Sequence, residues 1–327
     1  MPKRAKRWLK KTLLAVTLVI VVALVVVAVV VGWRLTRPPL AVRLGYRETD
    51  KLLIVNADDG GMCDSANQAV WQGMQEGMIS SCTLMVPCPS FPAAAEFAKA
   101  HPNLDFGIHL THTSEWKTHR WGPVLPAEDV PGLVDPSGCL WHEVQGENGV
   151  YSHATPAEAT REARAQIRAA LAAGVDITHL DSHMGAMQYS PVYFLRYIWL
   201  GREFGLPIRI PSPETLEKHG AAKLRTLVRA LGLVCPDYLL LGEGKEKGQT
   251  AKEYWISQLR QLKPGVTELF THPALETEEM QSITATWKWR YAEFRAFLDD
   301  PDVQAVIKEE GIQIIGYREL RDLQRGE

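Results

Sequence analysis

The sequence predicts an α/β fold in which parallel strands close into a barrel, preceded by one transmembrane helix. Three observations lead to this prediction. Short apolar runs alternate with longer helical patterns through residues 51–327, eight such runs follow one another at roughly even spacing, and residues 13–33 form one uncharged apolar stretch. Alternating strands and helices favour a parallel sheet, and eight evenly spaced strands favour a barrel over an open sheet.

The charged residues are divided unevenly along the chain of 327 residues. Residues 1–40 contain eight Lys and Arg and no acidic residue, whereas residues 41–327 carry 28 basic and 38 acidic residues. Nucleic-acid binding depends on Lys and Arg against phosphate, so an acidic body argues against a nucleic acid as partner. With 46% hydrophobic and 23% charged residues, the composition is globular and excludes a disordered chain.

Residues 1–12 are predicted to be a basic cytoplasmic segment, residues 13–33 a membrane anchor and residues 34–50 a linker to the domain of residues 51–327. The apolar run would form a helix about 31 Å long, close to the ~30 Å hydrocarbon core of a bilayer. Lys and Arg before a span favour the cytoplasmic side. We therefore expect a single-pass membrane protein with a cytoplasmic N-terminus and an extracytoplasmic domain. A cleaved signal peptide is the alternative, which the length of the run disfavours.

The elements of the domain follow from the apolar pattern and its breaks. Strands are expected at Leu52–Asn56, Ser81–Val86, Asp105–Leu110, Ile177–His183, Leu206–Ile210, Tyr238–Leu241, Val266–Thr271 and Gln313–Gly316. Helices are expected at residues 64–77, 90–100, 156–173, 191–204, 214–231, 251–262 and 287–299. The sequence contains no Gly-rich nucleotide fingerprint.

Residues typical of metal and acid–base chemistry gather where four of these strands end. They are Asp58 and Asp59, His109, His179, Asp181 and His183, and Glu268 and His272. In a barrel of parallel strands the carboxyl ends meet at one face, which is where active sites lie. Four strands that converge there with Asp and His form a stronger signal than any one of them.

A carboxylate with two imidazoles is a common metal set that leaves positions open for water and substrate. Two adjacent carboxylates, Asp58 and Asp59, suit a divided task in which one binds the metal and the other stays free as a base. Alternation along a strand puts His179 and His183 on one face, so either could be a ligand, and His183 is favoured as the nearer to the strand end. Asp181 and Glu268 are candidates to orient imidazoles.

The motifs Asn56–Gly60, Gly107–Leu110, His179–His183 and His272-Pro273, in this order, resemble those of the YdjC-like carbohydrate deacetylases. The resemblance runs from about residue 51 to residue 322. It implies a distorted (β/α) TIM-like barrel of the polysaccharide deacetylase type, with a divalent-metal site that removes acetyl groups from N-acetylated sugars. It also implies a role for each site residue: metal ligands Asp59, His109 and His183, base Asp58 and acid His272.

The expected protein is thus a membrane-anchored, metal-dependent deacetylase of N-acetylated sugars or glycans, including lipid-linked ones, with Zn, Mg, Mn or Co as the metal. Two alternatives stay open. One is a non-catalytic glycan-binding envelope protein, and the other is a metal hydrolase that acts on another amide or ester. Met184-Gly185-Ala186-Met187 follows His183 where the family often has further histidines, so the substrate pocket is expected to differ.

Residues 112–153 form a long connection after the third strand, and such connections are usually functional or disordered. Trp116, Trp121 and Trp141 in this connection could stack on sugar rings or pack the loop onto the body. Arg290 is interpreted as a packing residue at the start of a late helix. The five cysteines show no CxxC spacing and are interpreted mainly as buried structural thiols.

Overall fold

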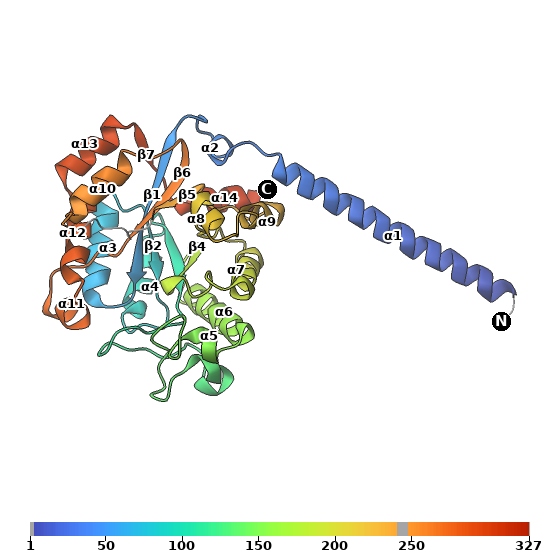
Figure 1. Cartoon of the computed structure of the whole chain (residues 1–327), viewed down its shortest axis with the longest axis horizontal. Coiled ribbons are helices and arrows are strands. Elements are labelled where there is room, and N and C mark those ends of the chain that lie inside the picture. Colours follow the sequence, from blue (N-terminus) through green and yellow to red (C-terminus); the bar gives the residue numbers. More distant parts are fainter. Residues whose placement is uncertain (1–2, 241–247, 327) are drawn as a thin grey trace.

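The computed structural model describes residues 3–240 and 248–326, in which helix α1 (Lys3–Leu35) projects from a body built around a parallel sheet (Figure 1). The sheet has seven strands in the order β4-β3-β2-β1-β6-β5, and β7 also pairs with β1. The strands are β1 (Lys51–Gly60), β2 (Ser81–Leu84), β3 (Phe106–Leu110), β4 (Ile177–Ser182), β5 (Tyr238–Leu240), β6 (Gly265–Thr271) and β7 (Ile312–Ile314). The predicted α/β fold with a parallel sheet is confirmed, in the form of a half-barrel.

The helices largely follow the predicted pattern. They are α2 (Leu40–Arg43), α3 (Asp64–Glu76), α4 (Phe91–Ala100), α5 (Val150–His153), α6 (Pro156–Ala172), α7 (Pro191–Phe204), α8 (Pro213–Lys218), α9 (Leu224–Ala230), α10 (Ala251–Leu259), α11 (Glu278–Ile283), α12 (Trp287–Leu298), α13 (Pro301–Glu309) and α14 (Tyr317–Gly326). Helix α6 begins with a reciprocal capping box between Thr155 and Glu158. The helix predicted over residues 214–231 is divided into α8 and α9, and Gly220, at a φ of +68°, lies in the break.

The strand predicted at Leu206–Ile210 is reduced to a single bridge between Leu180 and Ile208. The main-chain N–H of Leu180 donates to the Pro207 carbonyl over 3.0 Å, and that of Ile208 donates to the Val234 carbonyl over 3.3 Å. Pro207 has no N–H to give to a ladder, which shortens the pairing. This segment therefore lies beside β4 without forming a strand. Because a full strand is missing at this position, the barrel is distorted. Leu241, the predicted end of the next strand, lies outside the described residues.

Strand β1 lies at the centre of the sheet and is buried from Leu52 to Gly60. Leu53, Val55 and Ala57 belong to the large core cluster, whereas Leu52 and Ile54 belong to a second cluster with Tyr317 and Leu320. A strand that is apolar on both faces is typical of a covered parallel sheet. Because both faces are fixed by packing, the direction in which the end of β1 points is fixed as well.

The predicted membrane anchor at residues 13–33 is wrong. Within residues 3–240 and 248–326, no helix combines the length and apolar character that crossing a bilayer requires. This finding also overturns the predicted membrane localisation, with a cytoplasmic N-terminus and an extracytoplasmic domain. The prediction rested on the composition of residues 13–33 alone. Directly after that run, in the last turn of α1, Arg34 donates a hydrogen bond to the Ala230 carbonyl in α9 over 3.1 Å.

Replacing Gly107 in β3 with Ala should destabilise the body. An added Cβ would lie 2.5 Å from Cε1 of the His179 ring, and that ring is stacked against Tyr317 at a centroid distance of 3.6 Å, so it has little room to move. Overpacking of this kind costs about 1–3 kcal/mol of the free energy of unfolding. Urea unfolding measures it. Gly326→Ala, whose Cβ would meet nothing within 4 Å, is the control, and equal midpoints for the two variants would contradict the packing argument.

Candidate active site

A cavity of about 450 Å³ opens at the carboxyl ends of β1, β3, β4 and β6. Its lining includes the five residues that the sequence singled out for metal binding and catalysis: Asp58, Asp59, His109, His183 and His272. The first four are buried, and His272 is half-buried. The structure therefore brings together, in one cavity, side chains from four separate strands.

The backbone is unusual at two positions of this cavity. Asp59 has a φ of +65° and Met184, directly after His183, has a φ of +49°; they are the two non-glycine residues with positive φ in the described part of the chain. The pairing of β1 with β2 also shifts between Ala57 and Gly60, which is typical of a bulge. A left-handed conformation costs about 1–2 kcal/mol for a residue with a Cβ. Such strain concentrates at functional sites, where it serves to aim side chains.

Asp59, His109 and His183 form a compact cluster in which one ligand-type atom from each residue lies within 4.8 Å of the others. Asp59 Oδ1 is 3.5 Å from His109 Nε2 and 3.4 Å from His183 Nδ1. This buried oxygen has no hydrogen-bond partner among the described residues. A buried acceptor without a partner costs about 1–3 kcal/mol, more if charged. The donor set therefore fits a divalent cation that the three atoms would share.

Each imidazole of this cluster is oriented by a second carboxylate. His109 Nδ1 is 2.6 Å from Asp181 Oδ1, and His183 Nε2 is 2.8 Å from Glu115 Oε2. Each ring therefore turns its other nitrogen toward Asp59, in the manner of metal-binding histidines whose second nitrogen is held by a carboxylate. The sequence singled out Asp181 for such a role. Glu115 was missed, because it lies on the long connection after β3 and not at a strand end.

The carboxylates also govern the protonation of the cluster. Burial by itself would lower the pKa of His183, but Glu115 and Asp59 raise it to about 10. Burial opposes ionisation of Asp59 as well, yet Arg290 and His183 hold the pKa of this carboxyl well below its usual range. Without a metal, His183 therefore carries a proton at neutral pH, and a cation bound to this imidazole has to displace it.

Asp58 makes a bidentate ion pair with Arg209, whose Nη1 and Nη2 lie 2.7 Å from Oδ2 and Oδ1 of the carboxylate. Arg209 Nη1 is also 2.9 Å from Asp181 Oδ2, and Nε is 2.8 Å from Glu268 Oε1. Asp58, His109 and Asp181 also lie close enough to hold an ion. In this second group the guanidinium already supplies the positive charge between the two carboxylates, so the group with Asp59 is the better candidate.

Glu268 was expected to orient an imidazole, but it binds Arg209 and accepts a hydrogen bond from Tyr317 Oη over 2.5 Å. Burial raises its pKa to about 7, against the opposing effect of Arg209. His179, the alternative ligand, points away from the cluster: its ring stacks on Tyr317 and its Nε2 is 3.2 Å from Asn56 Oδ1. Burial lowers the pKa of His179 well below the usual value. The structure thus distinguishes His179 from His183 as a candidate ligand, whereas the alternation of side chains along the strand placed both on the same face.

Arg290, interpreted from the sequence as a packing residue, lies in the cavity wall. Its Nη2 is 2.9 Å from Asp59 Oδ2, so it binds the carboxylate oxygen that faces away from the two imidazoles. Arg209 and Arg290 were both missed as site residues. Arg209 could have been noticed as the one charged residue in the apolar segment Leu206–Ile210, whereas Arg290 lies in a helix with several other charged residues and gave no such signal.

The tryptophans of residues 112–153 pack the loop and do not line the cavity. Trp121 is buried, and its Nε1 donates to the Thr113 carbonyl over 2.9 Å. Trp141 donates to the Gly132 carbonyl over 2.8 Å and stacks on His153. Trp116 lies beneath the guanidinium of Arg290, 5.7 Å from its Cζ. Of the two interpretations given to these residues, packing is the one that agrees with the structure.

The parallel half-barrel and the carboxylate–imidazole cluster at its carboxyl edge define a (β/α)-barrel protein with a candidate metal centre. The family model described as YdjC-like protein matches residues 52–309, a range that contains every residue of the cluster. The chain therefore belongs to the YdjC-like family, and the resemblance seen in its motifs is confirmed.

Relatives of known name are similar over nearly their whole length. The chain is 31% identical to a carbohydrate deacetylase of Thermoanaerobacter pseudethanolicus over 271 residues, which cover 83% of this chain and 100% of the relative. It is 31% identical to a carbohydrate deacetylase of Brevibacillus brevis over 269 residues, with coverage of 82% and 99%. A crystal structure from Enterococcus faecalis, described as a cellobiose-phosphate cleavage protein, matches with a TM-score of 0.69 and 27% identity, covering 83% of this chain and 99% of that one.

The raised pKa of His183 should make the stability of the metal-free protein depend on pH. The folded-state value of about 10 exceeds the unfolded value near ~6.5. The stabilisation is therefore fully present below the unfolded pKa and is lost as the pH rises through the folded one. Glu115→Gln removes the larger raising influence, so the pKa of His183 should fall and the loss should begin at lower pH. An NMR titration of His183, with urea unfolding at several pH values, measures both.

Glu128→Gln, on an exposed position of the same long connection, is the matched control for loss of one negative charge. It should leave the titration of His183 unchanged. If Glu115→Gln and Glu128→Gln gave the same His183 pKa, the proposed electrostatic origin of the shift would be refuted.

Proposed function

We propose that this protein is a metal-dependent deacetylase that hydrolyses the acetamido groups of N-acetylated sugars or glycans. One observation carries the proposal: a buried oxygen of Asp59 without a hydrogen-bond partner faces two imidazole nitrogens, in a cavity that also holds the ionised Asp58. The names of the two relatives as carbohydrate deacetylases support the same substrate class.

Asp59, His109 and His183 are the proposed metal ligands. One carboxylate and two imidazoles suit Zn, Mn or Co, and Mg less well, because imidazole is a softer ligand than water or carboxylate. When bound, a divalent cation supplies Lewis acidity, which lowers the pKa of a water molecule and polarises a carbonyl group. Asp181 and Glu115 would keep the two rings in position for that ion.

Asp58 is the proposed base. Against the effect of burial, Arg209 and His109 hold the pKa of its carboxyl well below the usual range, so the group is ionised at neutral pH, which is the state that a base requires. Among the described residues, Oδ2 receives its hydrogen bond from Arg209 alone, and a carboxylate oxygen has a second lone pair. That lone pair is the proposed acceptor for the proton of the attacking water.

His272 is the proposed acid for the departing amine. It lies in the cavity wall, and its main-chain N–H donates to Glu293 Oε2 over 3.0 Å, which fixes the chain directly after β6. Its ring is half-buried in the cavity wall, and imidazole is the side chain that most often serves as a general acid. The ring of Phe270 packs edge to face against it at a centroid distance of 5.6 Å.

Two neighbouring aspartates provide the central test. Asp59→Ala should lose bound metal and activity together, because it removes a proposed ligand. Asp58→Asn should retain metal but lower turnover by about 10²–10⁴-fold, the usual contribution of a general base. Metal content by elemental analysis and acetate release from N-acetylated and O-acetylated sugars measure the two effects separately, after circular dichroism has shown that both variants fold.

Two results would argue against the proposal. Full activity of Asp59→Ala would remove the ligand assignment. Acetate release from O-acetylated but not N-acetylated sugars would be consistent with metal-dependent hydrolysis but would show that the substrate is an ester and not an amide.

The rim of the cavity offers an aromatic surface for a sugar ring. Tyr189 lines the cavity and is 63% exposed. It lies against Gly185, where an added Cβ would come within 2.7 Å of the tyrosine ring, and Gly185 has a φ of +66°. The turn after His183 therefore requires glycine at position 185, both because of the positive φ and because a side chain there would collide with the Tyr189 ring. We propose that Tyr189 stacks on a sugar unit beside the one that is deacetylated.

Tyr189→Ala should raise KM for the disaccharide of N-acetylglucosamine by roughly 2- to 10-fold, since an aromatic ring contact is worth about 0.5–1.5 kcal/mol. The value of kcat should change little, because the ring lies at the rim and away from the proposed reacting groups. Steady-state acetate release measures both constants. Tyr189→Phe keeps the ring and should behave as the unmodified protein, and an unchanged KM in Tyr189→Ala would rule out the stacking role.

A further inference from the structure

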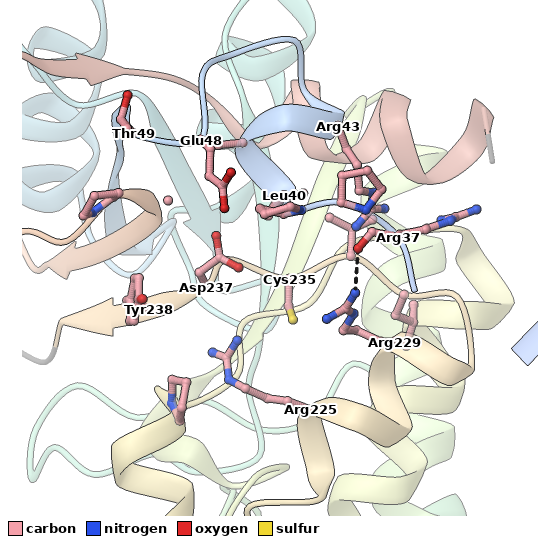
Figure 2. A pocket seen from close by; sticks show the side chains of 18 residues that line it. Arg37, Leu40, Arg43, Glu48, Thr49, Arg225, Arg229, Cys235, Asp237 and Tyr238 are labelled. Carbon is pink, nitrogen blue, oxygen red and sulfur yellow. Dashed lines mark hydrogen bonds between the residues drawn. The ribbon is translucent and has the colours of Figure 1, made fainter. Parts of the chain in front are cut away.

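A second and larger cavity, of about 760 Å³, lies at the other end of the strands (Figure 2). Its lining includes Thr49, just before β1, Tyr238 at the start of β5 and Gly265 at the start of β6. Asp58 and Asp59 stand at the opposite end of β1, so the sheet separates this cavity from the candidate active site. Its volume is within the range of about 300–1,000 Å³ that is usual for small-molecule sites.

Four arginines line this cavity, and they come from two separate parts of the chain. Arg37 and Arg43 belong to the segment before β1, whereas Arg225 and Arg229 belong to α9, one helical turn apart. Like charges spaced by four residues on a helix repel each other. Placing two further guanidinium groups at the same cavity adds to that repulsion, which a bound anion would relieve.

The two arginines of α9 donate hydrogen bonds to main-chain carbonyls, which carry no net charge and so do not neutralise the guanidinium groups. Arg225 donates to the carbonyls of Pro211 and Pro236 over 2.9 and 3.0 Å. Arg229 donates through Nη2 to the carbonyls of Leu35 and Arg37 over 3.4 and 3.3 Å. Neither forms an ion pair with a carboxylate among the described residues. Arg225 is thus fully engaged as a support, whereas Arg229 is exposed, and its Nε and Nη1 have no hydrogen-bond partner in the part of the chain that the structure describes.

The two acidic residues of the cavity lie on one side of it, where burial raises the pKa of Asp237 against the opposing effect of Arg225, Arg229 and Arg43. Figure 2 shows the side chains of Glu48 and Asp237 directed toward each other on one side, with Arg37, Arg43 and Arg229 on the other. The Asp237 carboxylate accepts the main-chain N–H of Val266 over 2.9 Å. Four guanidinium groups against two carboxylates leave an excess of positive charge for an anion, and the carboxylates can accept hydrogen bonds from hydroxyl or amino groups of the same ligand.

From this arrangement we infer that the cavity is a second binding site, for the phosphate group of a small polar phosphate ester of about the size of a phosphorylated sugar. Guanidinium groups bind phosphate by paired N–H donors in a fixed fork, and Arg is the residue of choice for such recognition. The carboxylates of Glu48 and Asp237 accept hydrogen bonds from the rest of the ligand. This site is independent of acetamide hydrolysis and does not rest on the proposed function.

Titration calorimetry and thermal unfolding of the full-length protein test this inference with three probes: inorganic phosphate, glucose 6-phosphate and glucose, each at the same ionic strength adjusted with sodium chloride. Both phosphates should bind and raise Tm, and glucose should do neither. Arg229→Gln should weaken phosphate binding at least ten-fold and abolish the Tm shift. Arg196→Gln, an exposed arginine on α7 outside the cavity, is the matched control and should bind phosphate as the unmodified protein does.

Comparing the three probes distinguishes the contribution of the phosphate group to binding from that of the rest of the ligand. Tighter binding of glucose 6-phosphate than of inorganic phosphate, with the difference lost in Glu48→Gln, would support the full assignment. Equal binding of the two would overturn the role of the carboxylates. No phosphate-dependent Tm shift at millimolar concentration, or the same shift in Arg229→Gln as in Arg196→Gln, would overturn the site itself.

Discussion

The ion pairs of the buried Arg209 are the interaction on which the candidate active site depends. One guanidinium binds carboxylates from three strands: Asp58 on β1, Asp181 on β4 and Glu268 on β6. Removing one partner from such a buried network costs about 3–5 kcal/mol, because an uncompensated charge stays behind. The same guanidinium keeps Asp58 ionised and leaves the other oxygen of Asp181 directed at His109. The position of the proposed base and the orientation of one proposed ligand therefore have a common origin.

Much of this arrangement follows from short-range information in the chain. The strand ends that carry Asp58, Asp59, His109, His183 and His272 could be read from the sequence, because apolar runs followed by polar residues mark the carboxyl edge of a parallel sheet. Of the residues that support them, Asp181 could be identified in the same way, but most of the others could not. Glu115 and Arg290 reach the site from a long connection and from a helix, and which charge meets which carboxylate depends on tertiary packing that a single sequence does not encode locally.

Composition identifies a property of a segment but not its surroundings, as two other features of the sequence show. Three tryptophans on one connection suggested either a surface for sugars or a packing role, and the indole N–H groups of Trp121 and Trp141 and the ring of Trp116 are used to pack that connection. The apolar run at residues 13–33 suggested a membrane span that the described structure does not contain. In contrast, Tyr189, a single aromatic residue without any compositional signal, lies exposed at the cavity rim because Gly185 leaves room for its ring.

The hydrogen bond from Tyr317 to Glu268 has a consequence for the biogenesis of the protein. Tyr317 opens the last helix, α14, and Glu268 holds Arg209, which in turn holds Asp58 near the beginning of the body. Strand β1 likewise takes its neighbours β6 and β7 from the end of the chain. A ribosome must therefore release almost the whole polypeptide before β1 has all of its neighbouring strands and the Tyr317 hydroxyl can reach Glu268. A chain truncated before Tyr317 would keep the four charged partners but lose this hydrogen bond and the tyrosine ring that stacks on His179, and such incomplete packing makes fragments substrates for chaperones.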